Sequence, residues 1–268
     1  MQIGFNFTLG ETLELVQRLI REGRIDYCEL LIDNFLQVPP DELARAFDCP
    51  VGFHIMFSKF LECDEATLHD LARRLRPYIA LLQPIYLSDH IARFSHRGRQ
   101  LFHLAEFDYV ADYERARQRV ALWQELLGQQ VFFENYPSLL DDGLAAPGFF
   151  ERLGQETGAG VLFDISNAVC AQRNCGLPLA AWQNVIASTR HFHVAGYSTA
   201  FIDERVAVDS HDRALAADTL AFLAQARGQL DKPGATLTYE RDDQIDYESV
   251  AEDLARLRQC FAAAEMAA

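Results

Sequence analysis

The chain has 268 residues, of which 50% are hydrophobic and 11% aromatic, and its formal net charge is −15. A surface this acidic repels phosphate backbones, so we expect no nucleic-acid partner. We also expect no membrane span, because no run of about 18 uncharged apolar residues is present. The first residues lack the regions of a secretory signal, and the six cysteines are scattered, which predicts a cytoplasmic protein with reduced thiols.

Short apolar, β-branched or aromatic runs recur along the chain. Eight of them are predicted strands: residues 3–7, 27–33, 51–56, 84–90, 130–136, 160–167, 189–196 and 235–242. Continuous apolar runs of this kind are typical of parallel strands that are buried on both faces. The segments between them favour helices, as the three- and four-residue apolar spacing indicates for residues 69–82, 111–128 and 247–261.

Eight strand–helix units predict an α/β protein. We expect a single-domain TIM (β/α)8 barrel over residues 1–268, although a doubly wound open sheet has similar local patterns. No low-complexity linker or shift in composition divides the chain.

Polar side chains gather at the carboxyl ends of the predicted strands. These are Asp33, Asn34, His54, Asp89, His90, Glu134, Asn135, Asp164, Asn167, His193, Glu240, Arg241 and Asp242. In a closed barrel the strand ends meet at one mouth, where active sites of TIM barrels lie. So many imidazoles and carboxylates in one pocket are unfavourable unless cations neutralise them. We therefore expect a metal site at the mouth, and the alternative is a set of unrelated capping and turn residues.

The seventh strand carries two histidines, His191 and His193, on one face. We expect His193 to bind metal at the mouth and His191 to lie one layer deeper, hydrogen-bonded below the site; the reverse assignment stays open. The loop that follows adds Asp209 and His211, which face the same way if the segment is extended.

The candidate metal ligands therefore combine imidazole, carboxylate and amide groups and include no thiolate. They are His54, His90, Glu134, Asp164, Asn167, His193, Asp209, His211 and Glu240. Such mixed ligation suits iron, manganese or zinc better than calcium or magnesium. Because nine ligands exceed what one ion needs, we expect two or three ions.

Seven blocks of the chain, in order, carry a resemblance to a known family: GFHIMFSK, YLSDH, ENYPS, LFDISNAVC, HFHVAG, DSHD and TYERD. With them, the chain resembles the multinuclear non-haem iron-dependent oxidases that modify ribosomally made peptides. Four stretches, MQIGFNFTLGETL, LLIDNFLQVPP, FDCPVGFHIM and DKPGATLTYERD, are most similar to members that make methanobactin, a copper-chelating natural product.

This resemblance implies a TIM barrel that holds two or three irons of mixed Fe2+ and Fe3+ state on the nine candidate ligands. It implies dioxygen-dependent oxidation of a cysteine in a precursor peptide to an oxazolone with an adjacent thioamide. It also implies a heterodimer with a small partner protein that recruits the leader of the precursor peptide.

Several further residues are candidates for contact with the substrate. They are Ser58, Asn135, Arg97 and Arg241. Arg97 lies in a basic stretch, residues 93–103, which is predicted to be a hairpin. This hairpin is either a solvated turn or a flap over an acidic or peptide substrate. Cys170 and Cys175 are either gate or redox residues or ordinary buried thiols.

Two other functions remain open at this stage. The first is a zinc- or manganese-dependent hydrolase or isomerase on the same barrel, and the second is a non-catalytic subunit. The acidic charge argues against a DNA-repair endonuclease, and four candidate imidazoles argue against a sugar isomerase.

Overall fold

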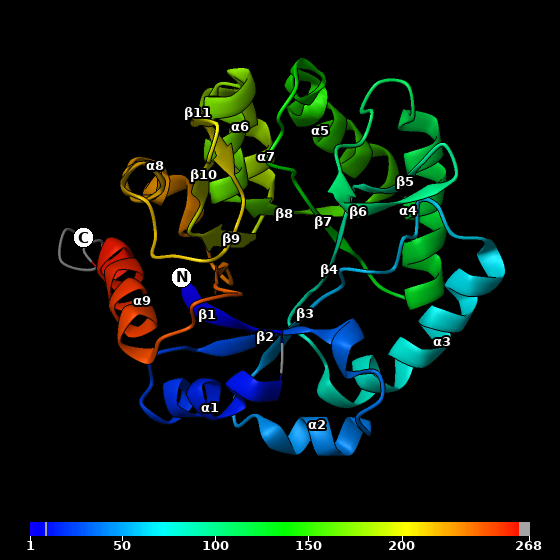
Figure 1. The fold of residues 1–268 in the computed structure, drawn as a ribbon. Coiled ribbons are helices and arrows are strands. Elements are labelled where there is room, and N and C mark those ends of the chain that lie inside the picture. Colours follow the sequence, from blue (N-terminus) through cyan, green and yellow to red (C-terminus); the bar gives the residue numbers. More distant parts are fainter. Residues whose placement is uncertain (9, 263–268) are drawn as a thin grey trace.

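Eight parallel strands close into a barrel at the centre of the computed structural model, which describes residues 1–8 and 10–262 (Figure 1). Each strand pairs with the next in the order β1 (Gln2–Phe7), β12 (Thr236–Glu240), β9 (His191–Ala195), β8 (Gly160–Asp164), β7 (Phe132–Glu134), β4 (Leu87–His90), β3 (Val51–His54) and β2 (Tyr27–Leu31). The barrel closes where β2 pairs with β1. The predicted TIM barrel is therefore confirmed, and the open-sheet alternative is excluded.

Helices surround the barrel on its outer face (Figure 1). They are α1 (Leu13–Arg21), α2 (Pro40–Ala46), α3 (Glu65–Leu82), α4 (Tyr113–Leu127), α5 (Ala146–Thr157), α6 (Ile165–Cys175), α7 (Gln183–Ser188), α8 (Ala217–Leu230) and α9 (Tyr247–Ala262). The three helices predicted by apolar spacing form, and each of their limits lies within four residues of the expected one.

Helix α4 illustrates how the sequence determines these helices. It begins after Asp112 and ends at Gly128, which adopts the left-handed conformation that favours glycine. Its side chains at Val120, Trp123 and Leu127 are buried against the core. Burial of each large apolar side chain stabilises the fold by about 1.5–3 kcal/mol, so the inward face of the helix fixes its position.

Two hairpins follow barrel strands and therefore leave the barrel at its mouth. The first joins β5 (Arg93–His96) and β6 (Arg99–Ala105), and it confirms the predicted hairpin. Its turn residues, Arg97 and Gly98, have φ values of 50° and 75°, as a two-residue hairpin turn requires. The second, β10 (Ser198–Ala200) with β11 (Asp203–Val208), was not predicted.

Seven of the eight barrel strands are shorter than predicted, all except β1, and in two of them the missing end starts another structure. Strand β8 stops at Asp164, whose Oδ1 accepts a hydrogen bond from the backbone N–H of Asn167 (2.6 Å) and caps α6. Strand β2 stops at Leu31, and residues Ile32–Phe35 form a 3₁₀ turn. In the part of the chain that the structure describes, no helix is long and apolar enough to cross a membrane.

Candidate metal centre

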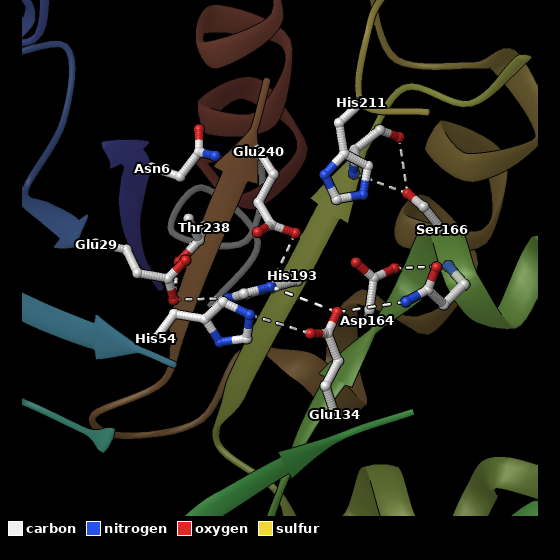
Figure 2. A network of polar contacts seen from close by, with 12 residues as sticks. Asn6, Glu29, His54, Glu134, Asp164, Ser166, His193, His211, Thr238 and Glu240 are labelled. Carbon is white, nitrogen blue, oxygen red and sulfur yellow. Dashed lines mark hydrogen bonds and ion pairs between the residues drawn. The ribbon is translucent and has the colours of Figure 1, made fainter. Parts of the chain in front are cut away.

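Five of the nine candidate ligands are the last residues of barrel strands: His54, His90, Glu134, Asp164 and Glu240. Asn167 lies in the first turn of α6, His193 lies in the middle of β9, and Asp209 and His211 lie in the loop after β11. The mouth contains a cavity of about 470 Å³. Residues of β3, β4, β7 and β12 form its floor, and residues of β6 and β11 form part of its wall. Figure 2 shows polar side chains from several strands converging in this region, among them His54, Glu134, Asp164, His193 and Glu240.

Glu134, at the end of β7, lies between two groups of candidate ligands. Its Oε2 lies 3.1 Å from Nε2 of His90 and 3.5 Å from Nε2 of His54. Its Oε1 lies 3.7 Å from Nδ1 of His193 and accepts a hydrogen bond from Nδ2 of Asn167 (3.3 Å). Each carboxylate oxygen of Glu134 therefore faces a different set of candidate ligand nitrogens.

Hydrogen bonds fix which ring nitrogen the histidines of β3 and β4 can offer to a metal. Nδ1 of His54 lies 2.7 Å from Oγ of Ser88, and that hydroxyl donates to the carbonyl oxygen of Phe53 (3.1 Å). The hydroxyl therefore accepts from Nδ1–H. Similarly, Nδ1 of His90 donates to the carbonyl oxygen of Ile55 (3.1 Å). Nε2 is consequently the ring nitrogen that each of these two histidines can offer to a metal.

His193 is fixed through Nε2 rather than through Nδ1. Its Nε2 lies 2.7 Å from Oε2 of Glu29 and donates to that carboxylate, which leaves Nδ1 as the ring atom that could bind a metal. Nδ1 lies 2.9 Å from Oε2 of Glu240, yet neither atom has a hydrogen-bond partner, because the geometry of that contact is unsuitable. A four-residue group results, in which the ligand atoms all lie within 4.8 Å of one another: Glu134, Asp164, His193 and Glu240.

Asp209 and His211 form a third group beside the other two. Nε2 of His211 lies 2.8 Å from Oδ1 of Asp209, again without a hydrogen bond. On its other side, Nδ1 of His211 lies 3.1 Å from Oδ2 of Asp242, whose Oδ1 accepts from Nδ2 of Asn6 (2.8 Å). Asp242 thus orients the imidazole so that Nε2 points toward Asp209 and the cavity.

The arrangement fits a group of bound cations. Six buried polar atoms at the mouth have no hydrogen-bond partner: Asp164 Oδ2, Asn167 Oδ1, His193 Nδ1, Asp209 Oδ1, His211 Nε2 and Glu240 Oε2. Each such atom destabilises a fold by about 1–3 kcal/mol unless something satisfies it. Burial also raises the pKa of Glu240 to about 6 and lowers the pKa of His54 to about 3, so the protein alone disfavours charge at these positions. Metal ions would satisfy the atoms and stabilise the carboxylates.

Sequence reasoning missed Glu29, which lies in the middle of β2 rather than at its end. It is fully buried and contacts His193 from below, next to Tyr86 and Thr238. Burial opposes its ionisation, but the charge of His193 and their hydrogen bond lower the pKa of Glu29 overall. The sequence feature that could have indicated Glu29 is an acidic residue within an otherwise apolar strand, YCELL.

Other polar residues at strand ends have structural partners. Oδ2 of Asp33 accepts hydrogen bonds from the backbone N–H groups of Met56 (3.2 Å) and Phe57 (2.6 Å). Asp89 accepts a hydrogen bond from Nε1 of Trp123 (2.8 Å). These two carboxylates stabilise a loop and a helix rather than joining the ligand groups.

The four candidate substrate contacts have different surroundings. The side chain of Asn135 pairs with both backbone groups of Asp164, at 2.9 and 2.7 Å, although it also borders the cavity. The guanidinium of Arg241 donates to the carbonyl oxygens of Asp243 and Gln244, in the loop after β12. Ser58 is buried, and its Oγ accepts from the N–H of Phe60 (3.2 Å). Arg97 is exposed at the hairpin turn and lines a separate cavity.

His191 lies one layer below His193, as the two-residue spacing predicts. Its Nδ1 lies 2.9 Å from Oγ1 of Thr236, and its ring contacts Tyr86 and Phe132. All six cysteines are free thiols. Cys170 is buried, and burial holds its pKa above the ordinary value, which disfavours a reactive thiolate.

The fold and the site together define a parallel barrel with a carboxylate–imidazole cluster at its mouth, which is the arrangement of a TIM-barrel metalloenzyme. A family model described as "RiPP precursor modification enzyme MbnB/TglH/ChrH" matches residues 6–262, and the chain belongs to this family. RiPPs are ribosomally made, post-translationally modified peptides. The chain is therefore a member of an enzyme family that acts on peptide precursors, and the family resemblance seen in the sequence is confirmed.

Curated relatives share only moderate identity with this chain. A UPF0276 protein of Rhizorhabdus wittichii is 27% identical over 230 residues, which cover 82% of this chain and 81% of the relative. A UPF0276 protein of Anaeromyxobacter sp. is 26% identical over 192 residues, covering 68% of each chain.

Solved structures with the same fold include 3-keto-D-glucoside 4-epimerase from E. coli. It has a TM-score of 0.64 and 16% identity, with coverage of 97% of this chain and 100% of that one. Endonuclease IV from Thermus thermophilus has a TM-score of 0.62 and 17% identity, with coverage of 98% and 100%. At such low identity these similarities establish the barrel fold alone.

Proposed function

We propose that this chain uses two or three iron ions and dioxygen to oxidise a cysteine of a precursor peptide. The cysteine and its neighbouring amide become an oxazolone with an adjacent thioamide, as in methanobactin-type biosynthesis. The peptide loses four electrons and four protons, and one dioxygen molecule accepts them to give two molecules of water. The proposal rests on family membership and on a mixed oxygen–nitrogen site without a protein thiolate.

The observation that carries the proposal is the position of Glu134 between two groups of ligands. Through Oε2 it reaches His54 and His90, and through Oε1 it reaches toward His193. A bridging carboxylate supports more than one ion, and imidazole with carboxylate is a ligand set that suits iron. Bound iron would supply an anchoring position for the substrate thiolate and electrons for the reduction of dioxygen.

The residues of this chain hold the ligands rigid and shape the space above them. Ser88 and the carbonyl oxygen of Ile55 fix the rings of His54 and His90. Above the ligands, Leu104 of β6 and Val208 of β11 line the cavity from opposite hairpins. These apolar walls limit the access of water to the reacting peptide segment. Within the described residues that line this cavity there is no cysteine, so the substrate supplies the only thiol.

Exposed apolar side chains on the two hairpins also support the proposed heterodimer with a small partner protein. Phe102 of β6 and Phe201 and Ile202, at the β10–β11 turn, have relative exposures of 105%, 103% and 93%. Phe201 and Ile202 are neighbours at one turn, and adjacent exposed apolar side chains are typical of contact sites for other proteins. A partner at the hairpins would lie beside the cavity and present the leader of the precursor peptide there. We further propose that the enzyme works in the reducing cytoplasm, where its six thiols stay free.

The test is turnover of cysteine-containing precursor peptides by the iron-loaded chain, with and without candidate partner proteins encoded near its gene. We expect a mass decrease of four hydrogen atoms per modified cysteine, consumption of one dioxygen, and no product without oxygen. A peptide in which serine replaces cysteine is the matched control. Hydrolysis or isomerisation by the zinc- or manganese-loaded chain, with no oxidation by the iron form, would instead support the alternative metalloenzyme.

A further inference from the structure

A second cavity, of about 280 Å³, lies against the hairpin that borders the metal centre. Arg93, Ser95 and His96 of β5 line it, whereas His103 and Leu104 of β6 line the metal cavity. Ala92 borders both cavities. The hairpin is thus a wall shared by the two spaces, and a peptide that crosses it reaches both.

The charge of this second cavity differs from that of the rest of the molecule. The chain carries 24 Lys and Arg against 39 Asp and Glu. In the cavity, three guanidinium groups, those of Arg93, Arg97 and Arg115, face two carboxylates, those of Glu62 and Asp112. A local excess of positive charge on an acidic protein attracts anionic groups that the remaining surface repels.

Protein groups leave much of this hydrogen-bonding capacity unused. Nη2 of Arg93 forms an ion pair with Oδ2 of Asp112 at 3.7 Å, too far for a hydrogen bond, and the buried Nε of Arg93 has no hydrogen-bond partner. Oε1 of Glu62, in contrast, accepts from the backbone N–H groups of Phe94 (3.0 Å) and Ser95 (3.2 Å). One carboxylate is therefore committed to fixing the hairpin, while the guanidinium of Arg93 keeps free donors.

A neighbouring arginine adds to these donors. Nη2 of Arg115, in the first turn of α4, donates to the carbonyl oxygen of Leu61 (2.6 Å), which fixes the side chain at the cavity wall. Arg97 reaches the cavity from the hairpin turn and is exposed. Two guanidinium groups at the cavity wall and one exposed guanidinium match the planar, two-oxygen geometry of a carboxylate.

We infer that this cavity binds the carboxylate of an acidic side chain in the precursor peptide and so sets which cysteine enters the metal cavity. The inference rests on the proposed function, because it assigns the peptide substrate to the neighbouring site. The volume suits one side chain rather than a folded segment. A free phosphate ion has similar chemistry, and the experiment separates the two sources.

The test uses binding alone, without oxygen, on the metal-loaded chain. The probes are fluorescein-labelled peptides with one cysteine and three glutamates placed three, five or seven residues before it, and matched peptides with glutamine instead. Anisotropy is measured for the natural chain and for Arg93→Gln, Arg115→Gln and Arg205→Gln. Arg205, in β11, is the control, because it is an exposed hairpin arginine outside the cavity. Iron content and thermal unfolding show that each variant is folded and loaded.

We expect at least one glutamate peptide to bind the natural chain about tenfold more tightly than its glutamine match, or about 1.4 kcal/mol. Arg93→Gln and Arg115→Gln should abolish this ratio, and Arg205→Gln should keep it. Equal binding of both peptides, no binding of either, or a ratio unchanged in Arg93→Gln would overturn the inference. So would displacement by inorganic phosphate without any glutamate preference, which would identify a free-anion site. A glutamate preference without oxidation by the iron enzyme would support this inference and count against the proposed function.

Discussion

The barrel interior contains two polar layers that differ in whether their buried polar atoms have hydrogen-bond partners. At the mouth, buried atoms of candidate ligands such as His193 Nδ1, Asp164 Oδ2 and Glu240 Oε2 lack hydrogen-bond partners. One layer below, Tyr27 and Tyr86 both contact Oγ1 of Thr238, at 2.7 and 2.9 Å, and Tyr86 donates to Glu29. No buried side-chain atom of these lower residues lacks a partner.

The upper layer, at the mouth, holds the candidate metal ligands, and the lower layer supports them through hydrogen bonds. Buried polar groups are normally satisfied, and the lower layer follows that rule within the protein itself. The two tyrosines occupy space above glycines: a Cβ on Gly4 would lie 2.3 Å from the ring of Tyr27, and one on Gly52 would lie 2.9 Å from that of Tyr86. The lower layer is therefore closely packed, and Glu29 transmits this rigidity to His193.

The largest expected effect comes from removing the bridge at the mouth. Loss of a residue that only orients a ligand lowers metal affinity about 10- to 100-fold. Glu134→Ala removes a candidate ligand shared by two groups, so we expect it to lower metal affinity by more than about 100-fold. Metal content per chain and turnover should fall together. Asp33→Asn is the matched control, because it changes a half-buried carboxylate whose hydrogen bonds come from backbone N–H groups. Full metal content in Glu134→Ala would refute the bridging role.

A smaller effect is expected in the supporting layer. Glu29→Ala removes the acceptor for Nε2–H of His193, and metal affinity should fall about 10- to 100-fold while the barrel still folds. Glu29→Gln should lower metal affinity less than Glu29→Ala, because the amide oxygen of glutamine can still accept the hydrogen bond from His193. Tyr27→Phe, which removes only a contact with Thr238, serves as the control. The measurement is metal affinity by competition with a chelator, and equal affinities in all three variants would remove the distinction between the layers.

The smallest effect is expected at the deeper histidine. His191→Phe keeps the ring contacts with Tyr86 and Phe132 but loses the hydrogen bond with Thr236. The free energy of unfolding should fall by about 1 kcal/mol, with metal content unchanged. Denaturant unfolding and elemental analysis check both parts. A loss of metal here would reverse the assignment of the two histidines.

The sequence predicts the barrel well because burial on both faces leaves a clear apolar signal in each strand. Strand limits are less certain, since Asp164 both ends β8 and caps α6, which no apolar pattern reveals. The β10–β11 hairpin was missed because its residues are mostly exposed and carry no apolar alternation.

The candidate ligands could be predicted because parallel strands bring their ends together at one mouth. Glu29 was missed because that argument considers only strand ends, whereas its role comes from the interior layer. The surroundings of Asn135 and Arg241 depend on backbone groups of Asp164 and of the loop after β12, which only the folded chain brings near them.

We propose above all that the mouth of this barrel holds several iron ions. The most direct test is elemental analysis of the natural chain, purified without oxygen and without added metal. The account predicts two or three irons per chain, lost in Glu134→Ala and retained in Asp33→Asn. Zinc or manganese with little iron, persisting after iron supplementation, or no bound metal at all, would contradict it.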